Sequence, residues 1–256
     1  MKKTIFFLSV LFFFGCKEEK KWRLVWSDEF DKNGLPDTSK WTAEVGGDGW
    51  GNNELEYYTS GRMENARVEN GLLIIEARKE SWDSSHYTSA RLITKGKGDW
   101  QYGKIEVRAK LPKGRGTWPA IWMLASTNPT AWPDDGEIDI MEHVGYDQGV
   151  VHGTIHTKKY NHIIGTQKSG TMSVTDCSEQ FHIYGMEWNK DSLKISVDNH
   201  VYFRFANEHS YDAWPFDNKM HLLLNVAVGG GWGGAKGVDE SIWPQRMEVD
   251  YVRVYQ

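Results

Sequence analysis

The feature that most limits how this chain can fold is a succession of short β-prone runs, with no helix-period stretch among them. Each run is rich in β-branched and aromatic residues and is bounded by turn-forming residues. The runs lie at 71–80, 88–97, 102–111, 149–158, 181–189, 191–205, 219–230 and 246–256. Two segments between them, Asn189-Lys190-Asp191 and Asp198-Asn199, are typical of hairpin turns. The pattern predicts an all-β fold, a jelly-roll sandwich of two antiparallel sheets with a concave cleft.

Composition limits the partners that such a fold could bind. The 256 residues are 39% hydrophobic, which is enough for one large domain but cramped for two. A formal net charge of -5 and the absence of a basic stripe exclude nucleic acid as the expected partner. Thirteen Trp and eleven Tyr are more aromatic surface than a core usually needs. These observations favour a neutral or weakly charged ligand.

The first 21 residues are predicted to lie outside the fold. MKKTIFFLSVLFFFGC is a basic pair followed by an apolar run too short to span a bilayer, and we interpret it as an export signal. Cys16 resembles the acylated cysteine of a bacterial lipoprotein, and the following Lys-Glu-Glu resembles a surface-export tag. The alternative is a plain secretory peptide cut near residue 16. We expect residues 1–21 to be signal peptide and charged tether, and residues 22–256 to form one domain.

Cysteine use agrees with an exported domain that is held together by packing. Besides Cys16 the chain has only Cys177. With Cys16 acylated, no disulfide can form within the chain. Cys177 is predicted to be a buried apolar residue.

One segment, GEIDIMEHVG at 136–145, concentrates three acids: Glu137, Asp139 and Glu142. On a regular strand Glu137 and Asp139 share a face, whereas Glu142, five positions after Glu137, points the other way. A β-bulge around Met141 would return Glu142 to the same face. The two glutamates would then be four strand steps apart, and their carboxyl groups could approach to about 5 Å, the spacing of a retaining glycosidase.

Three neighbouring carboxyls cannot all stay ionised, and this suggests separate roles for them. We assign Glu142 as the group that holds a proton and acts as general acid, and Glu137 as the nucleophile. Asp139 would hydrogen-bond Glu137 and orient it. The alternatives are an exposed acidic strand without function and a site for a hard cation, although no further ligands follow at the spacing of a metal loop.

These residues resemble a known family, and the resemblance covers nearly all of residues 22–256. GEIDIMEHVG is similar to the bulged E-x-D-x-x-E signature of glycoside hydrolase family sixteen. Other stretches resemble its laminarinase-type members: LVWSDEFD, WGNNELEYYT, YTSARLITKGK, YGKIEVRAKLPKGRGTWPAIWML, VVHGTIHT, LNVAVGGGWGG and MEVDYVRVYQ. The resemblance implies a jelly roll and retaining endo-cleavage of β-linked glucans or galactans. It gives Glu137, Asp139 and Glu142 the roles assigned above.

Aromatic side chains are the first candidates for substrate binding, because the apolar faces of sugars stack on rings. Trp118 and Trp122 are four residues apart and therefore share a strand face, and Trp132 precedes the acids. Trp232 lies in a Gly-rich loop that could present a bare ring. The alternative for the first three is core packing, and for Trp232 it is a role as loop anchor.

The family resemblance adds further contacts. It implies that Asn53 and Arg91 touch the donor-side sugar and that His156 faces the cleft near the acids. It also implies a structural calcium ion held by Glu29 and, partly through backbone oxygens, by Gly71 and Asp250. No cofactor is expected for catalysis.

Four histidines raise the question of a zinc site: His143, His152, His156 and His162. On one strand His152 and His156 share a face but are about 13 Å apart. Ligands of one zinc ion lie near 2 Å from it, so the spacing argues against such a site. His152 is predicted only to pack.

The resulting expectation is a monomeric, exported endo-β-1,3-glucanase that hydrolyses laminarin-like glucan with retention. It would be an outer-membrane lipoprotein, anchored through Cys16, at the cell surface or facing the periplasm. Alternatives on the same fold are cleavage of mixed β-1,3-1,4-glucan such as lichenan, cleavage of an algal galactan, and transglycosylation. An alternative of another class is a glucan-binding lipoprotein without turnover.

Overall fold

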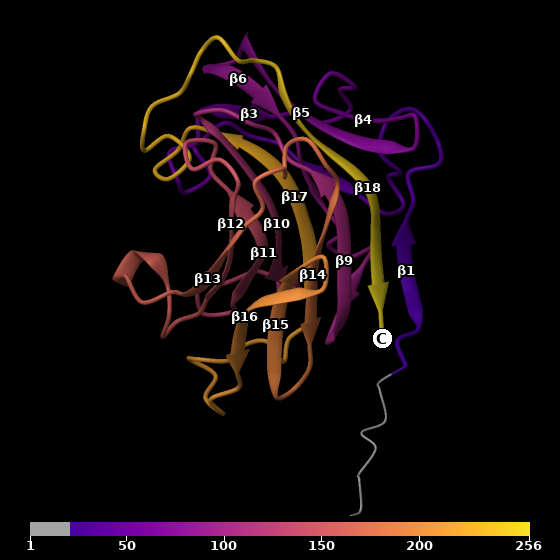
Figure 1. The fold of residues 1–256 in the computed structure, drawn as a ribbon, viewed down its shortest axis with the longest axis vertical. Coiled ribbons are helices and arrows are strands. Elements are labelled where there is room, and N and C mark those ends of the chain that lie inside the picture. Colours follow the sequence, from indigo (N-terminus) through magenta and orange to yellow (C-terminus); the bar gives the residue numbers. More distant parts are fainter. Residues whose placement is uncertain (1–20) are drawn as a thin grey trace, which may run out of the picture.

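The computed structural model describes residues 21–256, and within them it consists of two packed β-sheets (Figure 1). This arrangement confirms the predicted two-sheet sandwich, and strand pairing is antiparallel except between β3 (Glu56–Tyr58) and β6 (Ser85–Ser89). The predicted signal peptide and the predicted acylation of Cys16 lie outside the described residues. Nowhere in 21–256 is there a helix with the length and apolar character needed to cross a membrane.

The first sheet, called the outer sheet below, has ten strands. In spatial order they are β16 (His200–Ala206), β15 (Ser192–Val197), β14 (His182–Trp188), β9 (Gly103–Lys110), β18 (Gln245–Tyr255), β5 (Leu72–Trp82), β6 and β3, with β1 (Leu24–Asp28) beside β18 and β4 (Ala66–Glu69) beside β5. Figure 1 shows the C-terminal end of β18 beside β1, so the last strand is paired on both sides.

The second sheet, called the cleft sheet, has eight strands. In spatial order they are β13 (Lys168–Ser173), β12 (Val150–His156), β11 (Glu137–His143), β10 (Thr117–Ala125), β17 (Met220–Val228), β7 (Arg91–Ile93) and β2 (Thr42–Glu44), with β8 (Asp99–Trp100) beside β17. The only helix among residues 21–256 is the short 3-10 element η1 (His162–Ile164) between β12 and β13.

Each β-prone run of the sequence forms strand, and one of them is divided between the two sheets. The run at 88–97 contributes the end of β6 to the outer sheet and β7 to the cleft sheet, with Ala90 between them. The hairpin turn at Asp198 and Asn199 is confirmed, because both residues have positive φ, 48° and 65°. This is the pattern of the two-residue turn that matches strand twist.

The core lies between the sheets and is centred on β17, in which all nine residues are buried. Leu222 and Leu224 of β17 belong to the same core as Ile138 and Ile140 of β11, two strands away in the cleft sheet. Full burial of one such side chain contributes about 1.5–3 kcal/mol. The predicted burial of Cys177 is confirmed, since it is 0% exposed and unpaired within the described chain.

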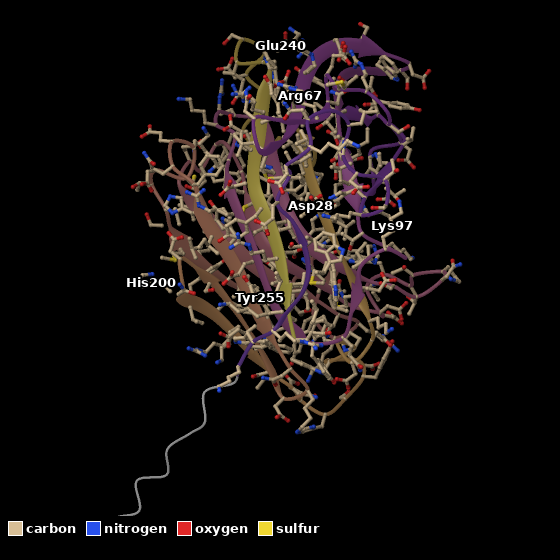
Figure 2. All side chains as sticks on the ribbon, turned by 90° about the vertical axis from the view of Figure 1, so that its right-hand side faces the viewer. Asp28, Arg67, Lys97, His200, Glu240 and Tyr255 are labelled. Atoms are coloured by element: carbon tan, nitrogen blue, oxygen red, sulfur yellow. The ribbon has the colours of Figure 1, made fainter. Side chains whose placement is uncertain are left out.

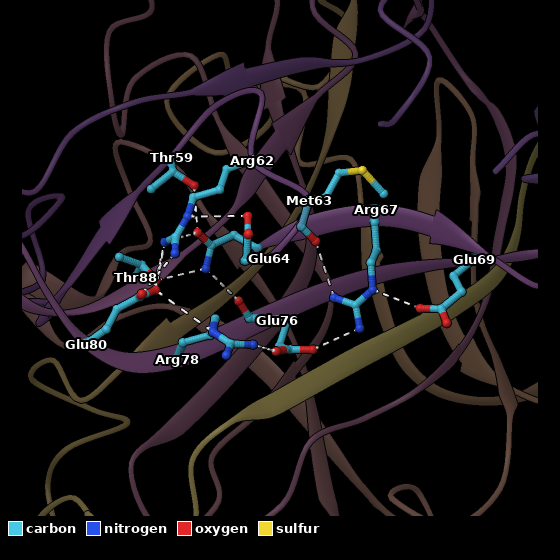
Figure 3. A network of polar contacts seen from close by, with 11 residues as sticks. Thr59, Arg62, Met63, Glu64, Arg67, Glu69, Glu76, Arg78, Glu80 and Thr88 are labelled. Atoms are coloured by element: carbon cyan, nitrogen blue, oxygen red, sulfur yellow. Dashed lines mark hydrogen bonds and ion pairs between the residues drawn. The ribbon is translucent and has the colours of Figure 1, made fainter. Parts of the chain in front are cut away.

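The solvent side of the outer sheet carries charged side chains such as Arg67 (Figure 2), and Figure 3 shows a group of them paired with one another. Glu76 on β5 accepts hydrogen bonds from Arg67 and Arg78, and Arg62 contacts Glu80 at 2.7 Å. Glu76 is only 5% exposed, so its pairs are part-buried, and the two guanidinium groups offset the cost of burying its carboxylate. The network also keeps this face polar, in contrast to the aromatic face of the cleft sheet.

Candidate functional site

The three acids of β11 face one cleft because the strand contains the predicted bulge. In the pairing of β11 with β12, Glu137 lies opposite His156 and Glu142 lies opposite His152, and the register shifts between Asp139 and Glu142. The two residues inside the shift, Ile140 and Met141, both belong to the core. One extra residue is therefore absorbed toward the core, and all three carboxyl groups remain on the cleft side.

The cleft has a volume of about 720 Å³ and lies over the cleft sheet. Its lining includes the loop before β3, the loop after β17 that is hydrogen-bonded to it, and residues of η1. Every residue predicted to bind substrate lines it: Asn53, Arg91, Trp118, Trp122, Trp132, His156 and Trp232. The tryptophans on β10 are half-buried rather than enclosed in the core. Their predicted position is confirmed, and their contacts with sugar stay a prediction.

Two of the tryptophans have a second role that sequence reasoning missed. The indole N–H of Trp132 donates to Glu137 at 2.8 Å, and that of Trp118 donates to Glu142 at 3.0 Å. A hydrogen bond to the ionised form of a carboxyl stabilises that form. Each glutamate is thus both oriented and partly charge-stabilised by an indole of the cleft wall.

Asp139 lies behind the glutamates and is almost completely enclosed. It is 2% exposed, and its Oδ2 has no hydrogen-bond partner among residues 21–256. His156 Nε2 lies 3.4 Å from this oxygen and 3.7 Å from Oε1 of Glu137. Burial raises the pKa of Asp139, and its interaction with Glu137 opposes the increase. The hydrogen bond expected between the two carboxyl groups stays a prediction.

Burial raises the pKa of Glu137, Asp139 and Glu142 alike, each to about 8. The negative charge of Asp139 adds to the increase at both glutamates, while the indole hydrogen bonds oppose it. We expected one carboxyl, Glu142, to stand apart as the proton holder. The raised pKa values do not distinguish the three, because loss of solvent acts on the whole group, and the role of Glu142 stays a prediction.

These shifts predict that the acid group destabilises the fold as pH rises. Below about pH 4.5 the carboxyl of Glu142 is protonated in both the folded and the unfolded chain. Between about pH 4.5 and pH 8 it keeps its proton only in the folded chain. The free energy of unfolding therefore falls as pH rises through this range. We expect Glu142→Gln to melt a few degrees higher than wild type at pH 8 and little differently at pH 4.5. Thermal denaturation across this pH range measures the difference.

A matched control comes from the outer sheet. Glu106 of β9 is ion-paired with Lys104 at 2.6 Å on the solvent side. Glu106→Gln should show no gain in melting temperature that grows with pH. A Glu142→Gln variant that tracked this control would contradict the electrostatic account of the cleft.

The guanidinium of Arg91 is held in place by contacts within the cleft. Its guanidinium lies between the rings of Trp50 and Trp122, 4.6 and 4.7 Å from their centroids. Its Nε donates to Glu44 at 2.6 Å, and the indole of Trp122 donates to Asn225 at 2.8 Å. This stack forms one firm wall of the cleft.

Trp232 is in the Gly-rich loop, as predicted, and lies beside Trp118 and His152. Its ring is perpendicular to those of Trp118 and His152, with centroids 5.6 and 4.9 Å away. His152 packs against Trp232, as expected, and it also lines the cleft. The two-residue alternation of β12 places it on the same face as His156.

Several cleft residues were not found from sequence: Trp50, Asn52, Glu54, His162 and Asn225. The first three adjoin Asn53 in the chain, so closer attention to the segment WGNNE could have found them. Asn225 lies on β17, opposite Ala120 of β10. That pairing joins strands about a hundred residues apart, and no local pattern reveals it.

Two metal sites were considered from the sequence, one for zinc and one for calcium. His143 is 0% exposed and accepts from the backbone of Gly149, so it is apart from the histidines of the cleft and the four form no zinc site. For calcium, the Glu29 carboxylate is bidentate to Arg253, and Asp250 accepts from Arg108. Gly71 adopts φ 78° with open space around it. Both carboxylates already have cationic partners that a calcium ion would have to replace, and the calcium site stays a prediction.

Comparison with known proteins identifies similar chains. The model of "Glycosyl hydrolases family 16" matches residues 53–253. A β-glucanase of Rhodothermus marinus is 53% identical over 273 residues, which cover 100% of this chain and 95% of that protein. The solved laminarinase of Rhodothermus marinus matches with a TM-score of 0.91 at 56% identity, over 92% of this chain and 98% of that one.

A further solved structure is of a non-specific endo-β-1,3(4)-glucanase mutant crystallised with 1,3-β-D-cellotriosyl-glucose. It matches with a TM-score of 0.90 at 53% identity, over 93% of this chain and 96% of that one.

Proposed function

This chain belongs to glycosyl hydrolase family 16, and on that basis we propose that it is a retaining endo-β-1,3-glucanase acting on laminarin-like polysaccharide. It is an endo-acting β-glucan hydrolase, and catalysis in this family needs no cofactor. The observation that supports the proposal is the bulged strand, which brings three enclosed carboxyl groups to the floor of one aromatic cleft.

The mechanism follows from the arrangement of the two glutamates. In the first step Glu142 gives its proton to the glycosidic oxygen while Glu137 attacks the anomeric carbon, and a covalent glycosyl-enzyme forms. In the second step Glu142 takes a proton from water, which releases the sugar with its original configuration. Raised pKa values suit this cycle, because a buried carboxyl keeps its proton until the leaving group needs it.

Asp139 and His156 both affect the pKa of Glu137, the proposed nucleophile. Burial raises the pKa of Glu137, the negative charge of Asp139 adds to the increase, and the interaction with His156 opposes it. Asp139 would also orient Glu137 from behind. Asp139 and His156 act in the same directions on the pKa of Glu142, so these interactions do not select which glutamate loses its proton.

The cleft wall suits a neutral glucan. Indoles offer flat apolar surfaces for the C–H faces of glucose units, and Asn53, Glu54 and Asn225 offer hydrogen-bonding groups for hydroxyls. A second candidate is cleavage of mixed β-1,3-1,4-glucan, which the similarity to a non-specific endo-β-1,3(4)-glucanase favours.

The test gives the purified protein laminarin, lichenan and agarose in parallel and follows reducing ends and product sizes. We expect short oligosaccharides from laminarin, with lichenan cleaved equally or more slowly. Cleavage of lichenan alone would replace the proposal with the second candidate, and cleavage of agarose alone would make the chain a galactanase. Binding without cleavage would make it a glucan-binding protein, and products longer than the substrate would indicate transglycosylation.

The indole bonds predict a specific change in pH dependence. Trp132→Phe removes a donor that lowers the pKa of Glu137, so that pKa should rise and the acidic limb of the kcat/KM profile should move to higher pH, by up to about one unit. Trp122→Phe is the control, since its indole bonds to Asn225 rather than to a carboxyl. Equal shifts in both variants would contradict this role of Trp132.

We also propose that the domain is exported and anchored to the outer membrane through Cys16, on the strength of the N-terminal pattern alone. The monomeric state and the calcium ion at Glu29, Gly71 and Asp250 likewise stay proposals.

A further inference from the structure

The contacts of His156 are not explained by hydrogen bonding. Its Nε2 is 3.4 Å from Asp139 Oδ2 and 3.7 Å from Glu137 Oε1. An N–H···O hydrogen bond in proteins is about 2.7–3.2 Å long, so both separations exceed it. Oδ2 of Asp139 is moreover a buried acceptor with no hydrogen-bond partner among residues 21–256.

The same separations match those between ligands of one metal ion. Two ligand atoms each about 2.0–2.1 Å from a tetrahedral zinc ion are about 3.3 Å apart. One atom each from Glu137, Asp139 and His156 lies within 4.8 Å of the other two, so small side-chain rotations would bring all three onto one ion. Three protein ligands with a fourth position open to the cleft is a common zinc arrangement.

We propose that Glu137, Asp139 and His156 form a binding site for a borderline transition-metal ion of the zinc or copper class, and that its occupation inhibits the enzyme. An imidazole with two carboxylates selects such ions over calcium, which prefers six to eight oxygens. The ion would bind the nucleophile itself and exclude the sugar from it. The inhibitory part of this inference rests on the proposed function, whereas the binding part does not.

The site lies at the bottom of an open cleft, so a metal ion could reach it from solvent. His156 is 6% exposed and Asp139 2% exposed, while the cleft above them is open to solvent and includes His162, whose ring centroid is 5.2 Å from that of His156. The indole of Trp132 donates to Oε2 of Glu137, while Oε1 of the same carboxyl is the atom that lies 3.7 Å from His156 Nε2.

The test titrates Co²⁺ into the purified, tag-free protein and follows the visible absorption of tetrahedral Co²⁺, then displaces it with Zn²⁺. We expect one ion per chain. We also expect Zn²⁺ to raise KM for laminarin and EDTA to reverse this. His156→Gln and Asp139→Asn should each weaken Zn²⁺ binding by about tenfold or more. Circular dichroism verifies that both variants are folded.

The control is His182→Gln in the outer sheet. His182 is also flanked by two carboxylates, Asp176 and Asp198, but at shorter separations of 3.1 and 2.7 Å. This variant should bind Zn²⁺ as wild type does. Absence of a tetrahedral Co²⁺ spectrum, unchanged affinity in His156→Gln, or loss of binding in His182→Gln would each overturn the site. The Co²⁺ spectrum is recorded without glucan, so it tests metal binding even if the protein does not cleave glucan.

Discussion

Replacing Glu137 with serine should abolish laminarin hydrolysis, with a loss of roughly four orders of magnitude or more in kcat, because the chain then lacks the atom that attacks the anomeric carbon. A serine hydroxyl at this position would be too short to reach the sugar and is a weak nucleophile without a base. Reducing-end assays on purified protein measure the loss, which should come with an unchanged β-rich circular dichroism spectrum.

The fold should survive this change, since Glu137 faces the cleft and not the core. Removing a buried carboxyl whose pKa is raised should even increase the melting temperature near pH 8. Glu106→Ser is the matched control and should keep full activity, because Glu106 belongs to the outer sheet and does not line the cleft. An active, correctly folded Glu137→Ser protein would refute the assignment of the nucleophile.

Glu142→Ala should lower kcat by about 10²–10⁴-fold, and added azide should restore part of the rate. Without Glu142 the glycosyl-enzyme forms slowly from substrates with poor leaving groups, and water lacks a base to attack it. Azide needs no such base. It enters from the face that water would use, and the product should be the β-glycosyl azide.

The configuration of that azide distinguishes the two glutamates, which their pKa values do not. Oligosaccharides with activated leaving groups and NMR of the products give the answer. An α-azide from Glu142→Ala would mean that the roles of Glu137 and Glu142 are reversed. If azide restores no activity in a folded variant, Glu142 has a structural role in the cleft, through its hydrogen bond with Trp118, and does not act as the acid/base.

The local structural features of this protein could be predicted from its sequence. Strands, hairpin turns and the bulge depend on backbone conformation and on the two-residue alternation of side chains, both of which are set by neighbouring residues. That is why the positions of β11 and of the Asp198 turn, and the common face of Glu137, Asp139 and Glu142, were predicted correctly. The placement of Trp118 and Trp122 followed from the same alternation.

What the sequence left undetermined depends on which distant segments meet. Arg91 lies between two indoles, Glu137 and Glu142 each accept from a different tryptophan, and Asn225 reaches the cleft through strand pairing. The sequence alone determined which strands form and which acids share a face, because those depend on local backbone geometry. Only the tertiary structure decided the hydrogen bonds and raised pKa values of the acids, because desolvation and long-range register arise from packing of the whole chain.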